Sequence, residues 1–177
     1  MKKMIYYAAI LLLAVSCKTK ESTEIATSTS TSTSDYPYTL EKGWKDWQVG
    51  DPKHVGTVLK MLKAWETKNL TECVTYFADT VELALDHYRA VLPNDSIASF
   101  LQGSYMEYKD VKIKVQDWES VISADKKDEW ATVWYRQYWT NAKGVTDSID
   151  LINEAKMKDG KIATFDEYSL HFPEAKK

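Results

Sequence analysis

The most extended hydrophobic pattern in the chain covers residues 128–141, a run of aromatic and β-branched side chains without glycine or proline. This composition, with a period of two, predicts a β-strand. Large side chains occur on both faces of this strand. This indicates a central strand of a curved sheet, with one face on helices and the other on a pocket or a partner surface. The two faces are Trp130, Thr132, Trp134, Arg136 and Tyr138, and Ala131, Val133, Tyr135, Gln137 and Trp139.

The chain before this strand is predicted to hold three helices and a pair of short strands. The first helix begins at Asp51, an N-cap residue, followed by Pro52 at the first helical position and by apolar residues at helical spacing. The third helix follows a cap offered by residues 94–96. The other elements are expected at residues 71–77 for the second helix, 81–85 and 88–92 for the strands, and 97–105 for the third helix.

From residue 110 onwards the pattern is that of strands. Alternation of apolar and polar residues predicts strands at residues 111–122, 145–157 and 162–172, on either side of the central strand. The Asp159-Gly160 pair predicts a tight hairpin between the last two. The element order therefore predicts an α+β fold that ends in a four-stranded antiparallel meander.

The first sixteen residues have the features of a secretory signal. Lys2 and Lys3 precede an apolar run at residues 5–15 that is too short to span a bilayer. A small residue precedes Cys17, which resembles the lipobox of bacterial lipoproteins and implies that Cys17 is lipidated. Lys18 favours an outer-membrane location and leaves the leaflet open. The alternative is an ordinary signal peptide followed by a chance cysteine.

Composition divides the rest of the chain. Residues 17–34 are rich in serine and threonine and predict a disordered tether, residues 35–50 an aromatic strap that packs onto the domain, residues 51–173 the domain, and residues 174–177 a tail. Removal of residues 1–16 takes away two lysines and no acids, so the net charge of −3 becomes −3 − 2 = −5. A mildly acidic chain with scattered charges has no electrostatic footprint for nucleic acid.

The same element order, with the sequence of residues 69–79 and of residues 158–162, resembles the NTF2-like superfamily, including its SnoaL-like members. The resemblance covers residues 52–172. It implies a strongly bent antiparallel sheet wrapped around three helices, which makes a cone with one pocket. A lipocalin-like or cystatin-like α+β fold is the competing interpretation.

The superfamily includes ketosteroid isomerases, whose chemistry needs a carboxylate base with a tyrosine and a protonated acid as oxyanion donors. The resemblance puts Met61, Leu83 and Asn153 at these three positions, so none of the roles is filled and no catalytic residue is assigned. Asp86 lies near Leu83, but strand alternation predicts the opposite face for it. An isomerase of that type is therefore not expected.

The resemblance also implies a ligand pocket in the cone. It turns Asn153 and Glu167 inwards and favours the face of the central strand that carries Arg136, which would pair with Glu167 or anchor a ligand carboxylate. The alternative is that the aromatic residues fill the core and Arg136 lies on a solvated face. The candidate ligand-binding residues are Trp65, Trp134, Arg136, Tyr138, Asn153 and Glu167.

No metal site or cofactor is predicted. His54, His87 and His171 lie far apart, and the sequence has no glycine-rich phosphate loop. Cys73 lies in a helical pattern and is expected to be a small buried hydrophobic residue.

Three functions follow as hypotheses. The first is a lipid-anchored envelope domain that binds a small hydrophobic or amphipathic ligand without transforming it. The second is a lyase or isomerase that uses Glu167 or Asp86 as a base, which requires a buried carboxylate with a raised pKa. The third is an interaction module that forms a homodimer or binds a partner protein through Tyr135 and Trp139 on the outer face of the sheet.

Overall fold

The computed structural model describes residues 36–43, 45–86 and 88–170. The chain divides into two units, Met1–Glu41 and Lys42–Lys177. In the first unit, the side chains of Tyr36 and Tyr38, which were expected to pack as part of the aromatic strap, are exposed. The predicted signal, Cys17 and the tether lie outside the described residues. The fold below is that of the second unit.

The first two helices form as their caps predict. Helix α1, Pro52–Glu66, begins at Asp51, whose side chain accepts a hydrogen bond from the Lys53 backbone N–H at 2.9 Å. Its apolar stripe is buried, which confirms the predicted helix. Helix α2, Leu70–Thr75, is capped in the same way by Asn69. The predicted second helix extended to Phe77, but this residue is the first of strand β2, which spans Phe77–Leu85.

Helix α3, Asn94–Tyr105, has the predicted position but not the predicted cap. Its N-cap is Pro93, and no side chain caps it. The Asn94 amide instead donates to the carbonyl oxygens of Phe77 and Ala78, both at 3.2 Å. This side chain thus joins the start of α3 to the start of a strand, which holds α3 beside the sheet.

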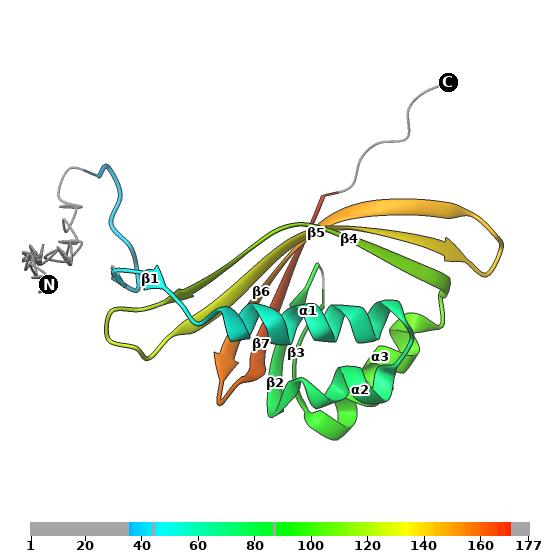
Figure 1. Ribbon diagram of the computed structural model, residues 1–177, viewed down its shortest axis with the longest axis horizontal. Coiled ribbons are helices and arrows are strands. Elements are labelled where there is room, and N and C mark those ends of the chain that lie inside the picture. The colour runs from blue at the N-terminus through cyan, green and yellow to red at the C-terminus, as the bar shows by residue number, and fades with distance from the viewer. Residues whose placement is uncertain (1–35, 44, 87, 171–177) are drawn as a thin grey trace, which may run out of the picture. The chain divides into compact units, whose positions relative to one another are not determined.

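One sheet of seven strands organises the described part of the domain, in the order β1-β4-β5-β6-β7-β2-β3 (Figure 1). The predicted meander of β4 to β7 is confirmed, whereas β2 pairs in parallel with β7 and a short β1 adds to β4. Both of these pairings are additions to the sequence prediction. The strands are β1 Gln48–Val49, β2 Phe77–Leu85, β3 Tyr88–Pro93, β4 Tyr108–Ile122, β5 Glu129–Asn141, β6 Thr146–Lys158 and β7 Lys161–Leu170.

The hairpin between β6 and β7 has the predicted tight turn. Asp159 and Gly160 both have positive φ, 52° and 74°. Two successive positive φ values are what a type I′ turn requires, and Asp-Gly is a favoured pair for it. The turn thereby fixes the register in which β6 and β7 bring their side chains together.

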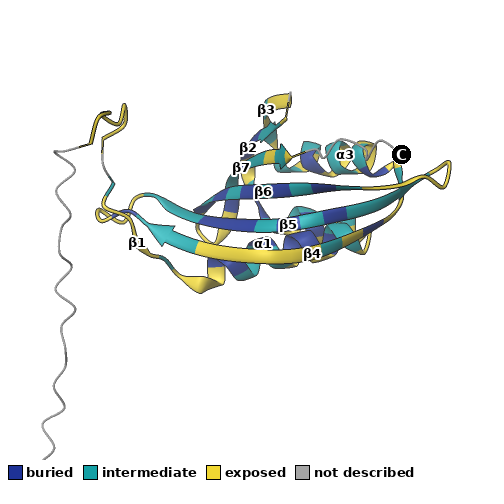
Figure 2. Cartoon of the chain, turned by 90° about the horizontal axis from the view of Figure 1, so that it is seen from above, coloured by how far each residue is buried: buried dark blue, intermediate teal, exposed yellow. Residues whose placement is uncertain are grey.

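The core lies between the helices and the inner face of the sheet (Figure 1). Helix α1 packs on β4, β5 and β7. Buried positions lie along β5 and β6, whereas β4 is largely exposed (Figure 2). Cys73 is completely buried, as expected. Other completely buried residues are Val58, Val81, Ala131, Val133, Ala155 and Ile162.

The inner face of β5 is the opposite of the predicted one. Val133, Tyr135 and Gln137 are buried. Directly paired residues of an antiparallel sheet place their side chains on the same side. Val133 pairs with Asn153 and Tyr135 with Leu151, and β6 alternates regularly between buried and half-buried positions. The buried positions of β6 therefore determine which face of β5 points inwards.

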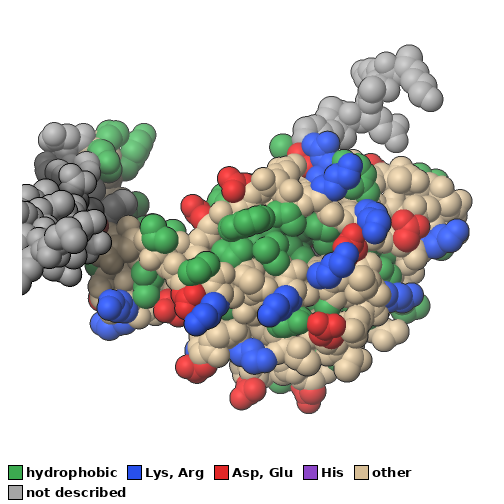
Figure 3. All heavy atoms as spheres, viewed as in Figure 1, with side chains coloured by type: hydrophobic (Ala, Val, Ile, Leu, Met, Phe, Trp, Pro, Cys, Tyr) green, Lys and Arg blue, Asp and Glu red, His purple; other side chains and the backbone are tan. Residues whose placement is uncertain are grey.

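The helices do not cover all of this inner face. Trp118 pairs with Val133 across β4 and β5, yet its side chain is 56% exposed. Val115, which pairs with Tyr135, is also exposed. On the face seen in Figure 3, apolar side chains gather between α1 and the arch of β4 and β5.

The residues just before α1 are attached to the end of the sheet. The Lys45 ammonium lies 3.0 Å from an Asp128 carboxylate oxygen, and the Gly50 N–H donates to the Ser120 carbonyl oxygen at 2.8 Å. A Cβ at Gly50 would lie 2.5 Å from the Ser120 Oγ and 2.9 Å from the Val121 backbone. This close approach requires glycine.

Candidate functional site

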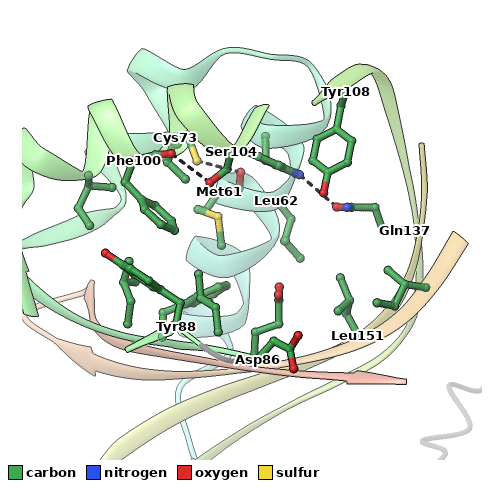
Figure 4. Close-up of a pocket in the computed structure, with 18 of the residues that line it drawn as sticks. Met61, Leu62, Cys73, Asp86, Tyr88, Phe100, Ser104, Tyr108, Gln137 and Leu151 are labelled. Atoms are coloured by element: carbon green, nitrogen blue, oxygen red, sulfur yellow. Dashed lines mark hydrogen bonds between the residues drawn. The ribbon is translucent and has the colours of Figure 1, made fainter. Parts of the chain in front are cut away.

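A cavity of about 540 Å³ lies between the three helices and the inner face of the sheet. Its volume is in the usual range for small-molecule sites, which are mostly apolar with a few polar groups. In Figure 4, Asp86 lies across the cavity from Met61, and at one side the rings of Tyr88 and Phe100 stack with their centroids 5.1 Å apart. Apolar residues that line it include Met61, Leu62, Leu83, Phe100, Leu151 and Phe165.

Aromatic rings form one end of the cavity. Trp65 and Trp139 both meet Tyr108 edge to face, with ring centroids 6.2 and 6.0 Å apart. The Trp65 indole N–H donates to the Gln137 Oε1 at 3.1 Å (Figure 4). A hydrogen bond and edge-to-face contacts therefore hold this wall in place.

Glu167, on β7, is the main ionisable group of the cavity. The Asn153 Nδ2 donates to its Oε2 at 3.2 Å from the paired position on β6. Burial raises the pKa of Glu167; the Asn153 hydrogen bond opposes the rise, and the charge of Asp86 adds to it. Asn153 is completely buried, and its Oδ1 has no hydrogen-bond partner among the described residues.

Asp86 also lines the cavity, although alternation along β2 predicted the opposite face from Leu83. Strand β2 ends at Leu85, and Asp86 has a φ of 43°, in the left-handed region. The backbone therefore leaves strand geometry at this residue, and alternation no longer decides where its side chain points. Leu83 lines the same cavity, so the prediction that separated the two is wrong.

Two tyrosines share this acidic environment. Burial raises the pKa of Tyr108, and the charges of Glu107 and Glu167 raise it further. The pKa of fully buried Tyr135 is raised in the same way by burial and then by Glu167. Both phenols are therefore protonated at neutral pH. Among the described residues that line the cavity, the charged side chains are all acidic: Asp86, Glu107 and Glu167.

Only part of the predicted site meets in the cavity. Trp65 and Glu167 line it, and Asn153 lies behind Glu167 and orients it. Trp134 and Tyr138 lie on the opposite face of β5 from the buried Tyr135, so their predicted place in the cone is wrong. The physical reason is the pairing with β6, which turns the other face of β5 inwards.

Arg136 also lies on the outer face, where its guanidinium makes two hydrogen bonds to the Asp150 carboxylate. Its Nη2 donates to the Asp150 Oδ2 at 2.7 Å, beside a second bond from Nε. The hydrogen bond from Arg136 lowers the pKa of Asp150. The predicted pairing with Glu167, or with a ligand carboxylate in the cone, is therefore wrong.

The same correction applies to the predicted dimer surface. Tyr135 and Trp139 line the cavity and are not on the outer face. Sequence reasoning missed both of them, together with Gln137, as cavity residues. The available signal was the register with β6: once Asn153 points inwards, Val133 and its alternate neighbours must do so too.

Within residues 36–43, 45–86 and 88–170, no three His, Cys, Asp or Glu side chains gather in a way that could hold a metal ion. None of the helices in the same ranges combines the length and hydropathy of a bilayer-spanning segment.

No protein family and no curated protein matches the chain. Solved structures do resemble it. An NTF2-like protein of unknown function from Exiguobacterium is 16% identical, covers 66% of this chain and 99% of its own, and has a TM-score of 0.55. At such identity the likeness shows the fold, and the domain has the NTF2-like fold that the sequence predicted.

Of two further structures of similar fold, one contains a bound small molecule and the other is an enzyme. A hypothetical protein with a ketosteroid isomerase-like fold from Catenulispora acidiphila, in complex with trimethylamine, is 12% identical, covers 63% of this chain and 83% of its own, and has a TM-score of 0.53. An LEH-like epoxide hydrolase of M. tuberculosis is also 12% identical, covers 66% and 82%, and has a TM-score of 0.52. The fold thus occurs among both ligand-bound proteins and enzymes.

Proposed function

We propose that this domain of NTF2-like fold binds a small, mostly apolar molecule between its helices and the inner face of its sheet. The observation that carries the proposal is the cavity of about 540 Å³, whose wall is largely aromatic and aliphatic. Burial of apolar ligand surface supplies most of the affinity, and a few polar groups fix the orientation. Here these groups are Glu167, Asp86 and Gln137.

The wall is suited to hold a ligand without large rearrangement. Trp65 is fixed by its hydrogen bond to Gln137, and Glu167 by its hydrogen bond from Asn153. Side chains that are already fixed lose little conformational entropy on binding. The complex of one neighbour of this fold with trimethylamine is consistent with a small-molecule site.

The cellular location of the domain is also a proposal, which rests on the sequence alone. An N-terminal signal followed by lipidation at Cys17 would anchor the domain to the cell envelope, in the outer membrane, through residues 17–34. The intact mass of the mature chain tests this. The proposal requires a chain that starts at Cys17 with the added mass of acyl chains, and a Cys17→Ser variant without that mass. An unprocessed or unacylated chain would contradict it.

A second candidate function is acid–base catalysis by a lyase or isomerase. Glu167 favours it, because it is a half-buried carboxylate in the cavity with a pKa raised by burial, close to the condition that the enzyme hypothesis set. Incubation of the purified protein with an extract of host metabolites distinguishes the two functions. An enzyme consumes one compound, and Glu167→Gln stops the consumption. A binding protein retains a compound unchanged.

The direct test of the binding proposal is to identify what the protein carries. We expect the full chain, purified from its own host and denatured in organic solvent, to release a small molecule in near-stoichiometric amount. The matched variant Leu151→Trp fills the cavity and should release none, whereas Glu119→Gln, an exposed position of β4, should release the wild-type amount. Equal release from all three proteins, or from none, would contradict the proposal.

A further inference from the structure

We infer that the ligand of the cavity carries a positively charged amine, which is bound between the carboxylate of Glu167 and the aromatic end of the cavity. This inference rests on the proposed function, because it names the chemical class of the molecule that the cavity binds. It follows from three separate features of the wall: its charges, its hydrogen-bonding groups and its rings.

The charges of the wall have one sign. Asp86, Glu107 and Glu167 line the cavity, and no Lys, Arg or His does so among the described residues. A carboxylate in an apolar site is costly unless a counter-charge or hydrogen bonds offset the lost hydration. A cationic ligand supplies that counter-charge, whereas an anionic ligand adds a further negative charge.

Glu167 is the hydrogen-bonding group of the wall that favours a ligand that donates. The Trp65 N–H already donates to Gln137 Oε1, and the Ser104 hydroxyl donates to the Phe100 carbonyl oxygen at 3.0 Å. Glu167 accepts one bond from Asn153 and, as an ionised carboxylate, can accept several more. The cavity therefore offers acceptor capacity at Glu167, which an ammonium group with its N–H donors can use.

The aromatic end suits the same group. Trp65, Tyr108 and Trp139 form an edge-to-face cluster. Tyr135, on β5, lines the same cavity. The faces of such rings attract cations, and aromatic cages are a common way to recognise alkylated ammonium groups. The Glu167 carboxylate lines the same cavity as Tyr108 and Tyr135.

A cation at this position also predicts how affinity depends on pH. The titratable groups that influence Glu167 from the surrounding elements are Asp86 after β2, Tyr108 on β4 and Tyr135 on β5. The phenols stay neutral near pH 7, so the carboxylates decide the charge. An amine binds better once Glu167 is ionised, and its affinity therefore increases as pH rises through the pKa of Glu167.

Three ligands of matched shape test the inference on the full chain: 4-phenylbutylamine, 4-phenylbutanol and 4-phenylbutyrate, titrated at pH 7.5 with tryptophan fluorescence or calorimetry. We expect the amine to bind about tenfold more tightly than the alcohol, and the butyrate to bind most weakly. Glu167→Gln should remove the preference for the amine, so that the amine binds the variant no more tightly than the alcohol does. Glu119→Gln, on exposed β4, is the matched control.

The outcomes separate this inference from the proposed function. If the wild-type protein binds the alcohol or the butyrate as tightly as the amine, the amine inference is overturned, whatever the variants do. If none of the three binds but the neutral dye Nile red does, and Leu151→Trp prevents it, the amine inference is again overturned while the cavity function stands. If Nile red also fails to bind, both are overturned.

Discussion

The Asn153 amide donates a hydrogen bond to the Glu167 carboxylate, 3.2 Å across the neighbouring strands β6 and β7. This bond joins a completely buried residue to the ionisable group of the cavity. It favours the ionised form of Glu167, yet burial dominates and the pKa remains raised. The pair therefore holds a carboxylate in an apolar cavity at a defined position, and several predictions depend on it.

Loss of the amide should raise the pKa of Glu167 further. Asn153→Leu removes the N–H that favours the ionised carboxylate and leaves burial unopposed at this position. We expect the Glu167 side-chain carbon resonance to titrate at higher pH in the variant than in the wild type. A pKa that stays the same or falls would show that the hydrogen bond does not control this group.

The stability of the protein should depend on pH through Glu167. Because its folded-state pKa lies above the ordinary value of 4.5, the folded protein holds this proton more tightly than the unfolded chain does. Stability from this group is fully present below pH 4.5 and is lost as pH rises through the folded-state pKa. Groups with a lowered pKa, such as Asp128, act in the opposite direction and lose stability as pH falls.

Glu167→Gln isolates that contribution. We expect the difference in unfolding free energy between the variant and the wild type to increase in favour of the variant from pH 4 to pH 8, measured by urea unfolding. Glu119→Gln, on exposed β4, should show no such pH-dependent gain. A gain that is equal at both pH values would contradict the assignment.

Of the adjacent β5 residues Arg136 and Gln137, only Gln137 should affect ligand binding. Gln137 points inwards and accepts the Trp65 N–H, so Gln137→Leu leaves a half-buried donor unpaired at the cavity wall. We expect a loss of about 1–3 kcal/mol in unfolding free energy and weaker Nile red binding. Arg136→Leu changes the outer face, where Arg136 pairs with Asp150, and should leave dye affinity unchanged. If Arg136→Leu weakened dye binding and Gln137→Leu did not, the inner face of β5 would be the one that carries Arg136, as the sequence pattern favoured.

The strap before α1 should depend on the absence of a side chain at Gly50. A Cβ there would approach the Ser120 Oγ and the Val121 backbone at less than 3.0 Å, so Gly50→Ala must displace the strap. We expect a loss of about 1–3 kcal/mol in unfolding free energy and faster amide exchange in β1. Gly103→Ala is the control, because nothing lies within 4 Å of its added Cβ and it is inside α3. There alanine should stabilise by about 0.5–1 kcal/mol.

The element order followed from local signals. Asp51 and Pro52 are a local signal for a helix start, and the Asp159-Gly160 pair has the backbone freedom that its turn requires. These signals act over a few residues, so the sequence alone was sufficient to predict α1 and the meander. The parallel pairing of β2 with β7 joins residues far apart in the chain, and no local pattern indicates it.

The candidate site was less predictable because both faces of β5 carry large aromatic side chains, and either face could point into the cavity. Both Trp134 and Tyr135 are large and aromatic, so alternation gives no preference. Only the pairing of Tyr135 with the buried Leu151 decides which of them lies inside. Asp86 was misplaced for a different reason, since its positive φ interrupts the alternation from which its face was inferred.

The most direct test of the account is an experimental structure of the protein purified from its own host without added ligand. We predict density for a small molecule in the cavity between α1, α3 and the inner face of β5, in contact with the Glu167 carboxylate and the ring of Trp65 or Tyr108. A cavity closed by collapsed side chains, or an occupied site on another surface with this one filled only by water, would contradict the account.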